Sequence, residues 1–336
     1  MKYKKTIISK FGGPEFLKTI EEDQLPEPKA NEVRIKVLHS CVNFTDIMIR
    51  KGKYPDVKEK PPFSTGYDMV GIVDKVGSNV KDLQTGQKVV DMTMIGAHAE
   101  YICLPEEQPV PLPEGVDPKE AVCLVLSYLT AYQMLHRTAN IKVGQKILVH
   151  GAGGAVGNAL LQLGKLHGLE MYGTASKSKR GLINENDATP IDYRNEDFVE
   201  RIKSETGNGV DAVFDPIGGK NFKKSLKSLN KGGKMVAYGF YNAVMGKGAS
   251  IPLDFMRLIA WNTLPNGKST VFYSIGAMRK NHPEWFKEDL NSLFHLLAEN
   301  KIKPVIAEQI NLNDIPKAHR KIENAEVNGK IIVNVT

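Results

Sequence analysis

Hydrophobic and polar positions follow two different rhythms along the chain, and the first rhythm covers residues 1 to about 123. Residues 31–43 (NEVRIKVLHSCVN) alternate apolar and polar side chains, and residues 69–80 (MVGIVDKVGSNV) form an apolar run that ends in a turn sequence. Glycine and proline clusters such as residues 109–118 (PVPLPEGVDP) separate these runs. The pattern predicts a β-rich, barrel-like domain of short strands over residues 1–123.

From about residue 124, apolar runs of strand length alternate with helical patterns. Residues 146–150 (KILVH) precede a helical pattern at 155–168, and residues 170–175 (EMYGTA) form the next short apolar run. The alternation continues through residues 210–240, where two more apolar runs flank a helical pattern. Strands that alternate with helices of about 10–15 residues indicate βαβ units. We therefore predict an α/β domain with a doubly wound parallel sheet over residues 124–267.

The remaining residues, 268–336, no longer follow this alternation. Residues 268–275 (KSTVFYSI) predict one further strand near the edge of the parallel sheet. Residues 283–302 carry apolar side chains at helical spacing and predict an amphipathic helix. A second helix near 314–325 and a final strand at 329–335 follow. We expect this segment to pack back on the first domain.

A glycine-rich loop lies between the strand at 146–150 and the helix that follows it. Ala152, Gly154 and Gly157 fit an A-x-G-x-x-G form of the dinucleotide fingerprint. In that motif the small residues allow a tight turn, a close approach of backbone N–H groups to a pyrophosphate, and close packing of helix on strand. The candidate cofactor-binding residues of the loop are Ala152, Gly153, Gly154, Ala155, Val156 and Gly157.

The end of the next predicted strand distinguishes between the two nicotinamide cofactors. An NAD site usually carries Asp or Glu there, about 20 residues beyond the loop, to bind the ribose 2′-hydroxyl. This chain has Ala175 and Ser176 instead, followed by Lys177, Lys179 and Arg180. A hydroxyl and positive charges attract a 2′-phosphate that a carboxylate would repel. The segment favours NADPH.

Composition places the chain among globular proteins without choosing a function. Its 336 residues are 41% hydrophobic and 25% charged, with a formal net charge of +7. No apolar run approaches the roughly 20 residues of a membrane span, and no signal peptide is recognisable, so we expect a cytoplasmic protein. The three cysteines are widely spaced and indicate neither a disulfide framework nor a zinc site.

Several motifs occur together along nearly the whole chain. They include CVNFTDIMIRKGKYP, STGYDMVGIVDKVGSNV, YLTAYQML, VHGAGGAVGNALLQL, DAVFDPIGG, GGKMVAYG and NGKIIV. In this combination the chain resembles the medium-chain dehydrogenase/reductase superfamily, and most closely its zinc-free quinone oxidoreductase branch, with zeta-crystallin-like and vesicle amine transport protein-like members. The resemblance implies a GroES-like catalytic domain over residues 1–123, a Rossmann domain over 124–267, and a segment 268–336 that returns to the catalytic domain.

The positions that hold catalytic zinc in zinc-dependent members of this superfamily carry other residues in this chain. The resemblance aligns those ligands with Asn43, in place of a cysteine, and with Tyr67, in place of a histidine. Neither an amide nor a phenol readily replaces a thiolate or an imidazole on Zn²⁺. The four-cysteine lobe of a structural zinc is also missing, because only Cys103 lies between Val90 and Pro109. We expect no metal.

Without a Lewis acid, the implied chemistry is hydride transfer from NADPH to a quinone or an α,β-unsaturated carbonyl. By resemblance, Asn43 lies in the substrate cleft, where its amide donates to the carbonyl or to a bound water. Tyr54 matches a cleft tyrosine that donates a hydrogen bond or relays a proton. Met48 stands where some relatives have a second cleft tyrosine, which leaves room for a more apolar acceptor.

The resemblance also implies cofactor contacts outside the glycine loop. Thr130 is assigned to the nicotinamide and phosphate region, and Ser176, Lys179 and Tyr193 to the adenosine 2′-phosphate.

Two further pairs complete the implied cofactor site. Gly239 and Phe240 belong to a loop beneath the ribose, and Asn328 and Lys330 contact the nicotinamide side or close the cleft.

A second interpretation, from another functional class, is binding to nucleic acid or to a membrane surface, with NADPH binding retained but without significant turnover. Its candidate feature is a helical stripe of lysines that includes Lys220, Lys223, Lys224, Lys227 and Lys231, opposite an apolar stripe. No aromatic residues interleave with these lysines, as binding of a single-stranded nucleic acid would require.

The sequence also bears on the assembly state and on the electron acceptor. An apolar edge strand at residues 268–275 needs cover, so we expect a homodimer with a small-molecule substrate. The shape of the cleft depends on loops such as residues 241–250, whose arrangement the sequence does not give. The identity of the acceptor therefore stays open.

Overall fold

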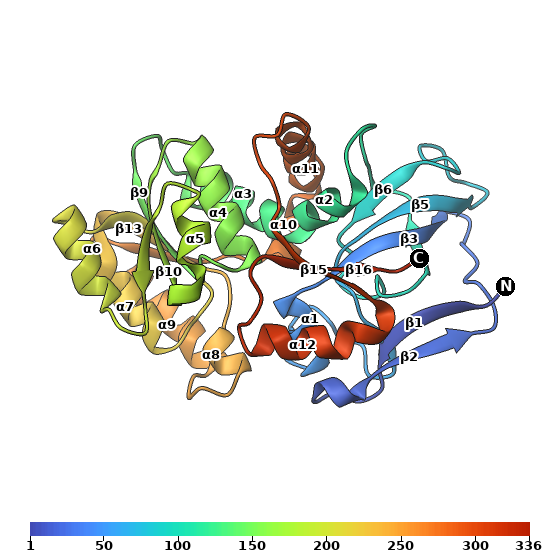
Figure 1. Ribbon diagram of the computed structural model, residues 1–336, viewed down its shortest axis with the longest axis horizontal. Coiled ribbons are helices and arrows are strands. Elements are labelled where there is room, and N and C mark those ends of the chain that lie inside the picture. Colours follow the sequence, from blue (N-terminus) through green and yellow to red (C-terminus); the bar gives the residue numbers. More distant parts are fainter. The chain divides into compact units, whose positions relative to one another are not determined.

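The computed structural model describes all 336 residues, which divide into two compact units (Figure 1). Unit 1 comprises Met1–Leu126 and Leu290–Thr336, and unit 2 comprises Ser127–Asp289. The segment expected at residues 268–336 is thus shared: its first strand lies in unit 2, and the chain re-enters unit 1 at Leu290. None of the helices combines the length with the apolar character that a membrane span requires.

Unit 1 is built on two β-sheets. A seven-stranded sheet has the order β15-β16-β3-β5-β6-β8, with β7 also paired to β3, and a three-stranded sheet has the order β2-β1-β4. The strands are β1 (Tyr3–Ile8), β2 (Leu17–Glu22), β3 (Glu32–Val42), β4 (Phe63–Ser64), β5 (Met69–Val76), β6 (Lys88–Asp91), β7 (Tyr101–Pro105), β8 (Val110–Pro111), β15 (Ile306–Asn311) and β16 (Lys330–Asn334). The helices are α1 (Phe44–Arg50), α2 (Pro118–Cys123) and α12 (Ile315–Glu323).

The strand β16 brings the end of the chain between β15 and β3 in this sheet. It pairs antiparallel with β3, with Ile331 opposite Val42 and Ile332 opposite Cys41. The same register sets Lys330 beside Asn43, at the point where β3 gives way to α1. Two candidate residues that are far apart in the sequence therefore become neighbours within unit 1.

Unit 2 contains a six-stranded parallel sheet with the order β11-β10-β9-β12-β13-β14. Numbered from its first strand, this order is 3-2-1-4-5-6, the order of a doubly wound dinucleotide-binding fold, which confirms the expected fold class. The strands are β9 (Lys146–His150), β10 (Glu170–Ala175), β11 (Thr189–Asp192), β12 (Val210–Asp215), β13 (Leu229–Ala237) and β14 (Ser269–Phe272).

Helices connect these strands because parallel neighbours require crossover connections (Figure 1). They are α4 (Ala155–Leu166), α5 (Arg180–Asn184), α6 (Phe198–Thr206), α7 (Lys220–Ser228), α8 (Tyr241–Val244) and α9 (Ile251–Thr263), with α3 (Leu129–Gln133) before the sheet and α10 (Ile275–Asn281) after it. The predicted amphipathic helix is α11 (Pro283–Ala298), which begins in unit 2 and ends in unit 1.

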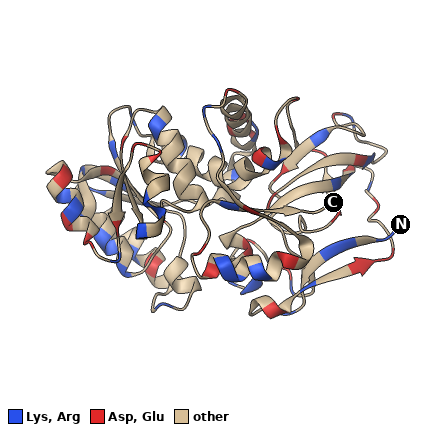
Figure 2. Ribbon diagram, viewed as in Figure 1, with Lys and Arg blue, Asp and Glu red and all other residues tan.

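The helix α7 carries four lysines of the expected stripe, all of them exposed to solvent: Lys220, Lys223, Lys224 and Lys227 (blue in Figure 2). The fifth, Lys231, does not belong to the helix, because it lies in β13. The buried side of α7 packs Phe222 into the core of unit 2. Lys224 forms an ion pair with Asp197, 2.8 Å away, at the start of α6. The stripe is thus the solvated face of a packed helix.

The helix α9 was not expected from the sequence. Leu258 packs into the core, while Leu253, Met256 and Ile259 are exposed on its outer side. Because apolar residues lie on both the buried and the exposed side of α9, the sequence lacks the periodic spacing that predicts an amphipathic helix.

Candidate functional site

The glycine loop connects β9 to α4, and its backbone conformation is restricted by close packing and by a hydrogen bond. Gly151 has φ +66°, a left-handed conformation that favours glycine. A Cβ on Gly157 would overlap the carbonyl oxygen of Gly151 and lie 2.7 Å from the Cα of Ala152. The N–H of Ala152 donates to the carbonyl of Thr174 on β10, at 3.1 Å. The first turn of α4 therefore packs directly on the loop backbone, as a pyrophosphate cradle requires.

The end of β10 lies next to this loop. A Cβ on Gly153 would come within 2.5 Å of the side chain of Lys179, so Lys179 lies over the loop. Burial lowers the pKa of Lys179. Ser176 lies at the start of the same short segment, where its hydroxyl is 3.1 Å from that of Ser178. Residues 176–180 contain no carboxylate, so a hydroxyl and basic side chains suited to a phosphate lie beside the loop.

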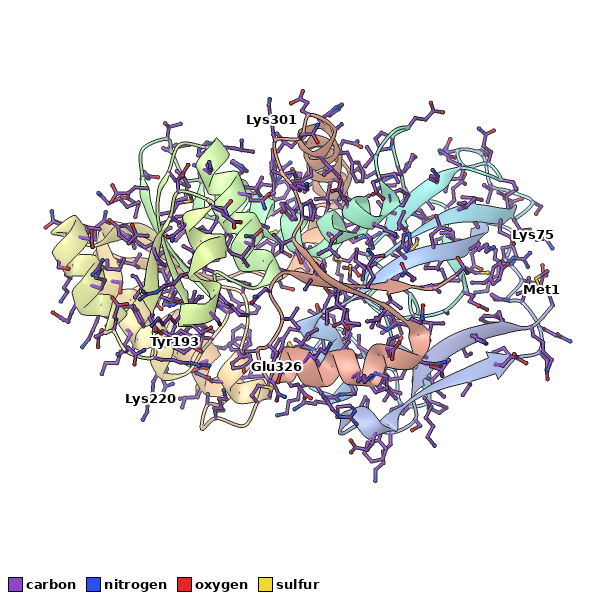
Figure 3. The ribbon with its side chains drawn as sticks, in the orientation of Figure 1. Met1, Lys75, Tyr193, Lys220, Lys301 and Glu326 are labelled. Carbon is purple, nitrogen blue, oxygen red and sulfur yellow. The ribbon has the colours of Figure 1, made fainter.

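The other residues assigned to the cofactor lie in different surroundings. Thr130 is buried on α3, whereas Tyr193 follows β11 and is exposed at the surface (Figure 3). A Cβ on Gly239 would contact the carbonyl oxygen of Pro216, at 2.9 Å. Phe240 stacks on Phe272 with ring centroids 5.0 Å apart, inside the core of unit 2. The backbone of Phe240, rather than its ring, is therefore the part suited to contact a ligand.

At the carboxyl ends of β9, β10 and β12, buried side chains form a chain of hydrogen bonds. His150, the last residue of β9, contacts the Thr174 hydroxyl at 2.9 Å and the Ser225 hydroxyl at 3.0 Å. Ser225 donates to Asp215, at 2.6 Å, and the same carboxylate accepts from the N–H of Ile217. Burial lowers the pKa of His150, so the imidazole is neutral and fixes the strand ends.

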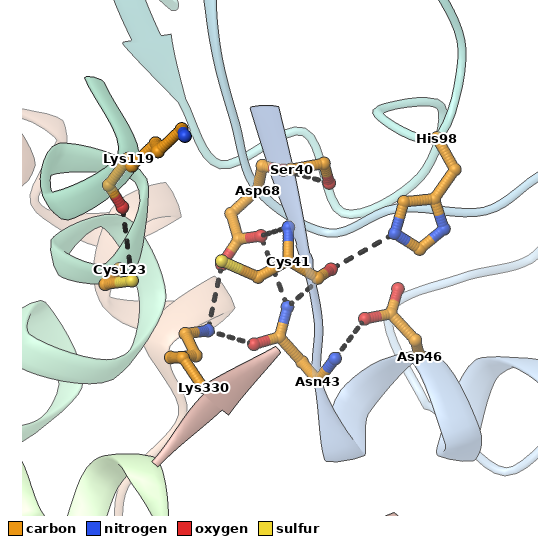
Figure 4. A network of polar contacts seen from close by, with 9 residues as sticks. All are labelled: Ser40, Cys41, Asn43, Asp46, Asp68, His98, Lys119, Cys123 and Lys330. Carbon is orange, nitrogen blue, oxygen red and sulfur yellow. Dashed lines mark hydrogen bonds and ion pairs between the residues drawn. The ribbon is translucent and has the colours of Figure 1, made fainter. Parts of the chain in front are cut away.

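In unit 1, three buried side chains form a connected network (Figure 4). The Lys330 ammonium donates to Oδ1 of Asn43 and to Oδ2 of Asp68, the latter at 3.3 Å. The Asn43 amide nitrogen donates to Oδ1 of Asp68, at 3.3 Å, and to the carbonyl of Cys41, at 3.4 Å. Of the two polar atoms of the Asn43 amide, only the oxygen can accept from an ammonium and only the nitrogen can donate to a carboxylate. These two contacts therefore fix the orientation of the Asn43 side chain.

This orientation bears on the role expected for Asn43. Both of its amide hydrogens have acceptors in unit 1, and its oxygen is held by Lys330. Donation to a substrate carbonyl would require exchange of one of these bonds. The structure thus places Asn43 and Lys330 together, but as partners of each other and of Asp68.

Opposite charges account for the burial of this network. Burial raises the pKa of Asp68, and the Lys330 ammonium opposes that rise. Burial alone would lower the pKa of Lys330, but the Asp68 carboxylate and neighbouring thiols raise it above its ordinary value. Asp68 also accepts from the N–H of Cys41, at 3.0 Å. A buried carboxylate and ammonium compensate each other only with such additional hydrogen bonds.

A second carboxyl group, Asp46, lies at the start of α1. Its Oδ2 accepts from the N–H of Asn43, at 2.8 Å, and completes a capping box. Its Oδ1 is buried without a hydrogen-bond partner. Burial, reinforced by the negative charge of Asp68, raises the pKa of Asp46 to about 7. Asp46 thus titrates near neutral pH beside the network.

Tyr54 is hydrogen-bonded to Tyr67, which the sequence analysis considered only as the residue in place of a zinc-binding histidine. The hydroxyls of Tyr54 and Tyr67 are 2.6 Å apart, and their rings meet edge to face at a centroid distance of 5.7 Å. Tyr67 is fully buried. Burial raises the pKa of Tyr54 to about 12 and that of Tyr67 well above its ordinary value, so both phenols are neutral at physiological pH.

Two further residues complete this region of unit 1. His98 is fully buried, which lowers its pKa to about 4, and its ring lies 3.1 Å from the Cys41 carbonyl and 2.7 Å from the Thr65 hydroxyl. Asn328 precedes β16, and its side-chain oxygen is buried without a hydrogen-bond partner. His98 therefore supports β3, while Asn328 retains an unused acceptor.

The metal positions inferred from the sequence are engaged in other interactions. Asn43 binds Lys330, and Tyr67 binds Tyr54. The chain contains no group of three or more His, Cys, Asp or Glu side chains arranged to hold a metal ion. An amide, a phenol and a buried ammonium form a donor set unsuited to Zn²⁺.

Comparison with known proteins places these features in context. Residues 29–114 match the alcohol dehydrogenase GroES-like domain, and residues 187–333 match the family model described as zinc-binding dehydrogenase. A quinone oxidoreductase of Rattus norvegicus is 32% identical over 322 residues, covering 94% of this chain and 92% of that protein. A synaptic vesicle membrane protein VAT-1 homolog of Danio rerio is 30% identical over 339 residues, covering 98% of this chain and 70% of that protein.

Solved structures show the same relationship. The quinone oxidoreductase of Escherichia coli, complexed with NADPH, superposes with a TM-score of 0.89 at 30% identity, covering 99% of this chain and 100% of that chain. The human synaptic vesicle membrane protein VAT-1 homolog-like protein superposes with a TM-score of 0.84 at 29% identity, covering 100% and 98% of the two chains.

Proposed function

We propose that this chain, which belongs to the zinc-free quinone oxidoreductase branch of the medium-chain dehydrogenase/reductase superfamily, is an NADPH-dependent reductase of quinones or α,β-unsaturated carbonyl compounds. The observation that carries the proposal is the glycine loop with the acid-free end of β10 beside it. There Gly157 allows close packing of α4, and Lys179 lies over Gly153. NADPH bound there would supply the hydride.

The residues of unit 2 suit a cofactor with a 2′-phosphate. The Ser176 hydroxyl and the Lys179 ammonium offer hydrogen bonds and positive charge. Ser176 stands where a carboxylate would favour NADH, and Lys179 follows it in the same segment. Burial lowers the pKa of the Lys179 ammonium, and a bound phosphate would be a hydrogen-bond acceptor of opposite charge for it. The loop residues 152–157 and the backbone at 239–240 complete this assignment.

In unit 1, the reaction needs a proton donor for the reduced acceptor. The hydride converts an enone to an enolate or a quinone to a hydroquinone anion, and a proton must then reach carbon or oxygen. Tyr54 is the partly buried hydroxyl of the Tyr54–Tyr67 pair, and it is protonated at neutral pH. The network of Asn43, Asp68 and Lys330 holds the start of α1, where Asn43 is the N-cap residue.

The test is a fluorescence titration of the purified protein with NADPH and NADH, followed by a panel of quinones and enals. We expect NADPH to bind at least about tenfold more tightly than NADH. We also expect NADPH oxidation to depend on one of these acceptor classes. A clear preference for NADH would contradict the roles of Ser176 and Lys179, and no turnover with any member of either class would contradict the reductase.

The edge strand β14 supports a homodimer as a further proposal. It pairs with β13 on one side only, and the neighbouring helix α9 exposes Leu253, Met256 and Ile259. A second copy would cover both the unpaired backbone and the apolar side chains. Light scattering coupled to gel filtration measures the mass directly, and a monomer at micromolar concentration would contradict the dimer.

A further inference from the structure

We propose that Tyr67 is a positioning residue for the reduction, because its buried hydroxyl donates a hydrogen bond to Tyr54 and leaves the proton of Tyr54 available to the acceptor. The inference rests on the proposed function. It gives Tyr67, which stands in place of a zinc ligand, a role of its own: the Tyr67 hydroxyl determines where Tyr54 can donate its proton.

The position of Tyr67 is fixed by its neighbours in the chain. Gly66 before it has φ +102°, and a Cβ there would overlap the backbone nitrogen of His98. The carbonyl of Tyr67 accepts from the N–H of Met94, at 3.1 Å, and Asp68 after it is held by Lys330 and Cys41. The Tyr67 ring is fully buried, so its hydroxyl has one fixed location.

The direction of the hydrogen bond follows from burial. Each phenol carries one proton, and the two oxygens, 2.6 Å apart, share one of them. If Tyr54 donated, the proton of the fully buried Tyr67 would have no acceptor, which is costly away from water. If Tyr67 donates, the remaining proton belongs to Tyr54, whose side chain is only partly buried. The second arrangement satisfies both hydroxyls.

The same bond assists proton transfer. When the reduced acceptor takes the proton, the electron pair of the O–H bond remains on Tyr54 as a phenolate, and a proton from solvent later restores the phenol. Burial disfavours that phenolate and raises the pKa of Tyr54, whereas the hydrogen bond from Tyr67 lowers the pKa. Tyr67 therefore stabilises the charge that forms on Tyr54 and fixes the direction in which Tyr54 donates.

A double-mutant cycle tests this relationship. Tyr67→Phe keeps the buried ring and removes only the hydroxyl. We expect it to lower kcat about tenfold with little change in KM, and Tyr54→Phe to lower kcat about 100-fold. The double variant should match Tyr54→Phe alone, because Tyr67 acts only through Tyr54. Equal effects of Tyr67→Phe in both backgrounds, or no effect in either, would overturn the proposal.

A control and a second readout keep the test independent of catalysis. Tyr172→Phe removes the hydroxyl of a buried tyrosine that bonds Glu170 in unit 2, and it should leave kcat within about twofold. The ¹³Cζ NMR signal of Tyr54, measured without substrate, should move in Tyr67→Phe and stay in place in Tyr172→Phe. An unmoved signal would overturn the hydrogen bond itself. A wild type that binds NADPH but reduces no acceptor would instead contradict the proposed function.

Discussion

The side chains of Lys330 and Asp68 form a buried ion pair, with 3.3 Å between Nζ and Oδ2, although 262 residues separate them. Lys330 begins β16 and Asp68 directly precedes β5, so the pair joins the last strand of the chain to the start of β5. Asn43 lies between them and contacts both. This network has consequences for stability that can be measured.

Removal of the cation should be more damaging than removal of both charges. We expect Lys330→Met to lower the free energy of unfolding by about 3–5 kcal/mol, because it leaves the Asp68 carboxylate buried and unpaired. The double variant Lys330→Met/Asp68→Asn should recover most of that loss. Urea unfolding of the three proteins measures both values. A double variant as unstable as Lys330→Met would show that the lysine contributes mainly through packing.

Asp46 should make stability depend on pH. Its pKa is about 7 in the folded protein and near its ordinary acidic value in the unfolded chain, so the folded state binds more protons between these values. The contribution of Asp46 therefore favours folding most at acidic pH and is lost as pH rises to about 7. Asp46→Asn should flatten this dependence. At pH 7.5 its free energy of unfolding should exceed that of the wild type by at least about 1 kcal/mol. Parallel stability curves for the two proteins between pH 5 and 7.5 would contradict the prediction.

A carboxylate at the end of β10 should remove the preference for NADPH over NADH. We expect Ser176→Asp to weaken NADPH binding at least about tenfold while NADH binding changes little, because the new charge repels the 2′-phosphate. Ser204→Asp introduces the same charge on α6, away from the loop, and serves as the control. Fluorescence titrations of both variants measure the change. Equal losses for the two cofactors would point to general damage to the loop.

The close packing at Gly157 should be required for cofactor binding. A Cβ there overlaps the carbonyl oxygen of Gly151, so Gly157→Ala must displace the loop or α4. We expect a loss of roughly 1–3 kcal/mol of stability and weaker NADPH binding. Gly181→Ala, on α5, is the matched control because a Cβ there meets nothing within 4 Å. Normal NADPH affinity in Gly157→Ala would remove the loop from the cofactor site.

The sequence by itself was sufficient for the parallel sheet and the glycine loop. Strands such as β9 and helices such as α4 follow from the spacing of apolar residues over a few turns of chain. The loop lies between consecutive elements, and the absence of a carboxylate at residues 176–180 can be seen directly in the chain. These features are local, so neighbouring residues determine them.

Tertiary structure alone decided how the residues of unit 1 act. The sequence indicated Asn43, Tyr54 and Lys330 separately, but only the pairing of β16 with β3 brings Lys330 to Asn43. Only the folded chain turns Tyr67 toward Tyr54 and places the ring of Phe240 in the core. The physical reason is that hydrogen bonds and ion pairs depend on distances of a few ångströms between segments that lie far apart in sequence, and those distances are set by packing.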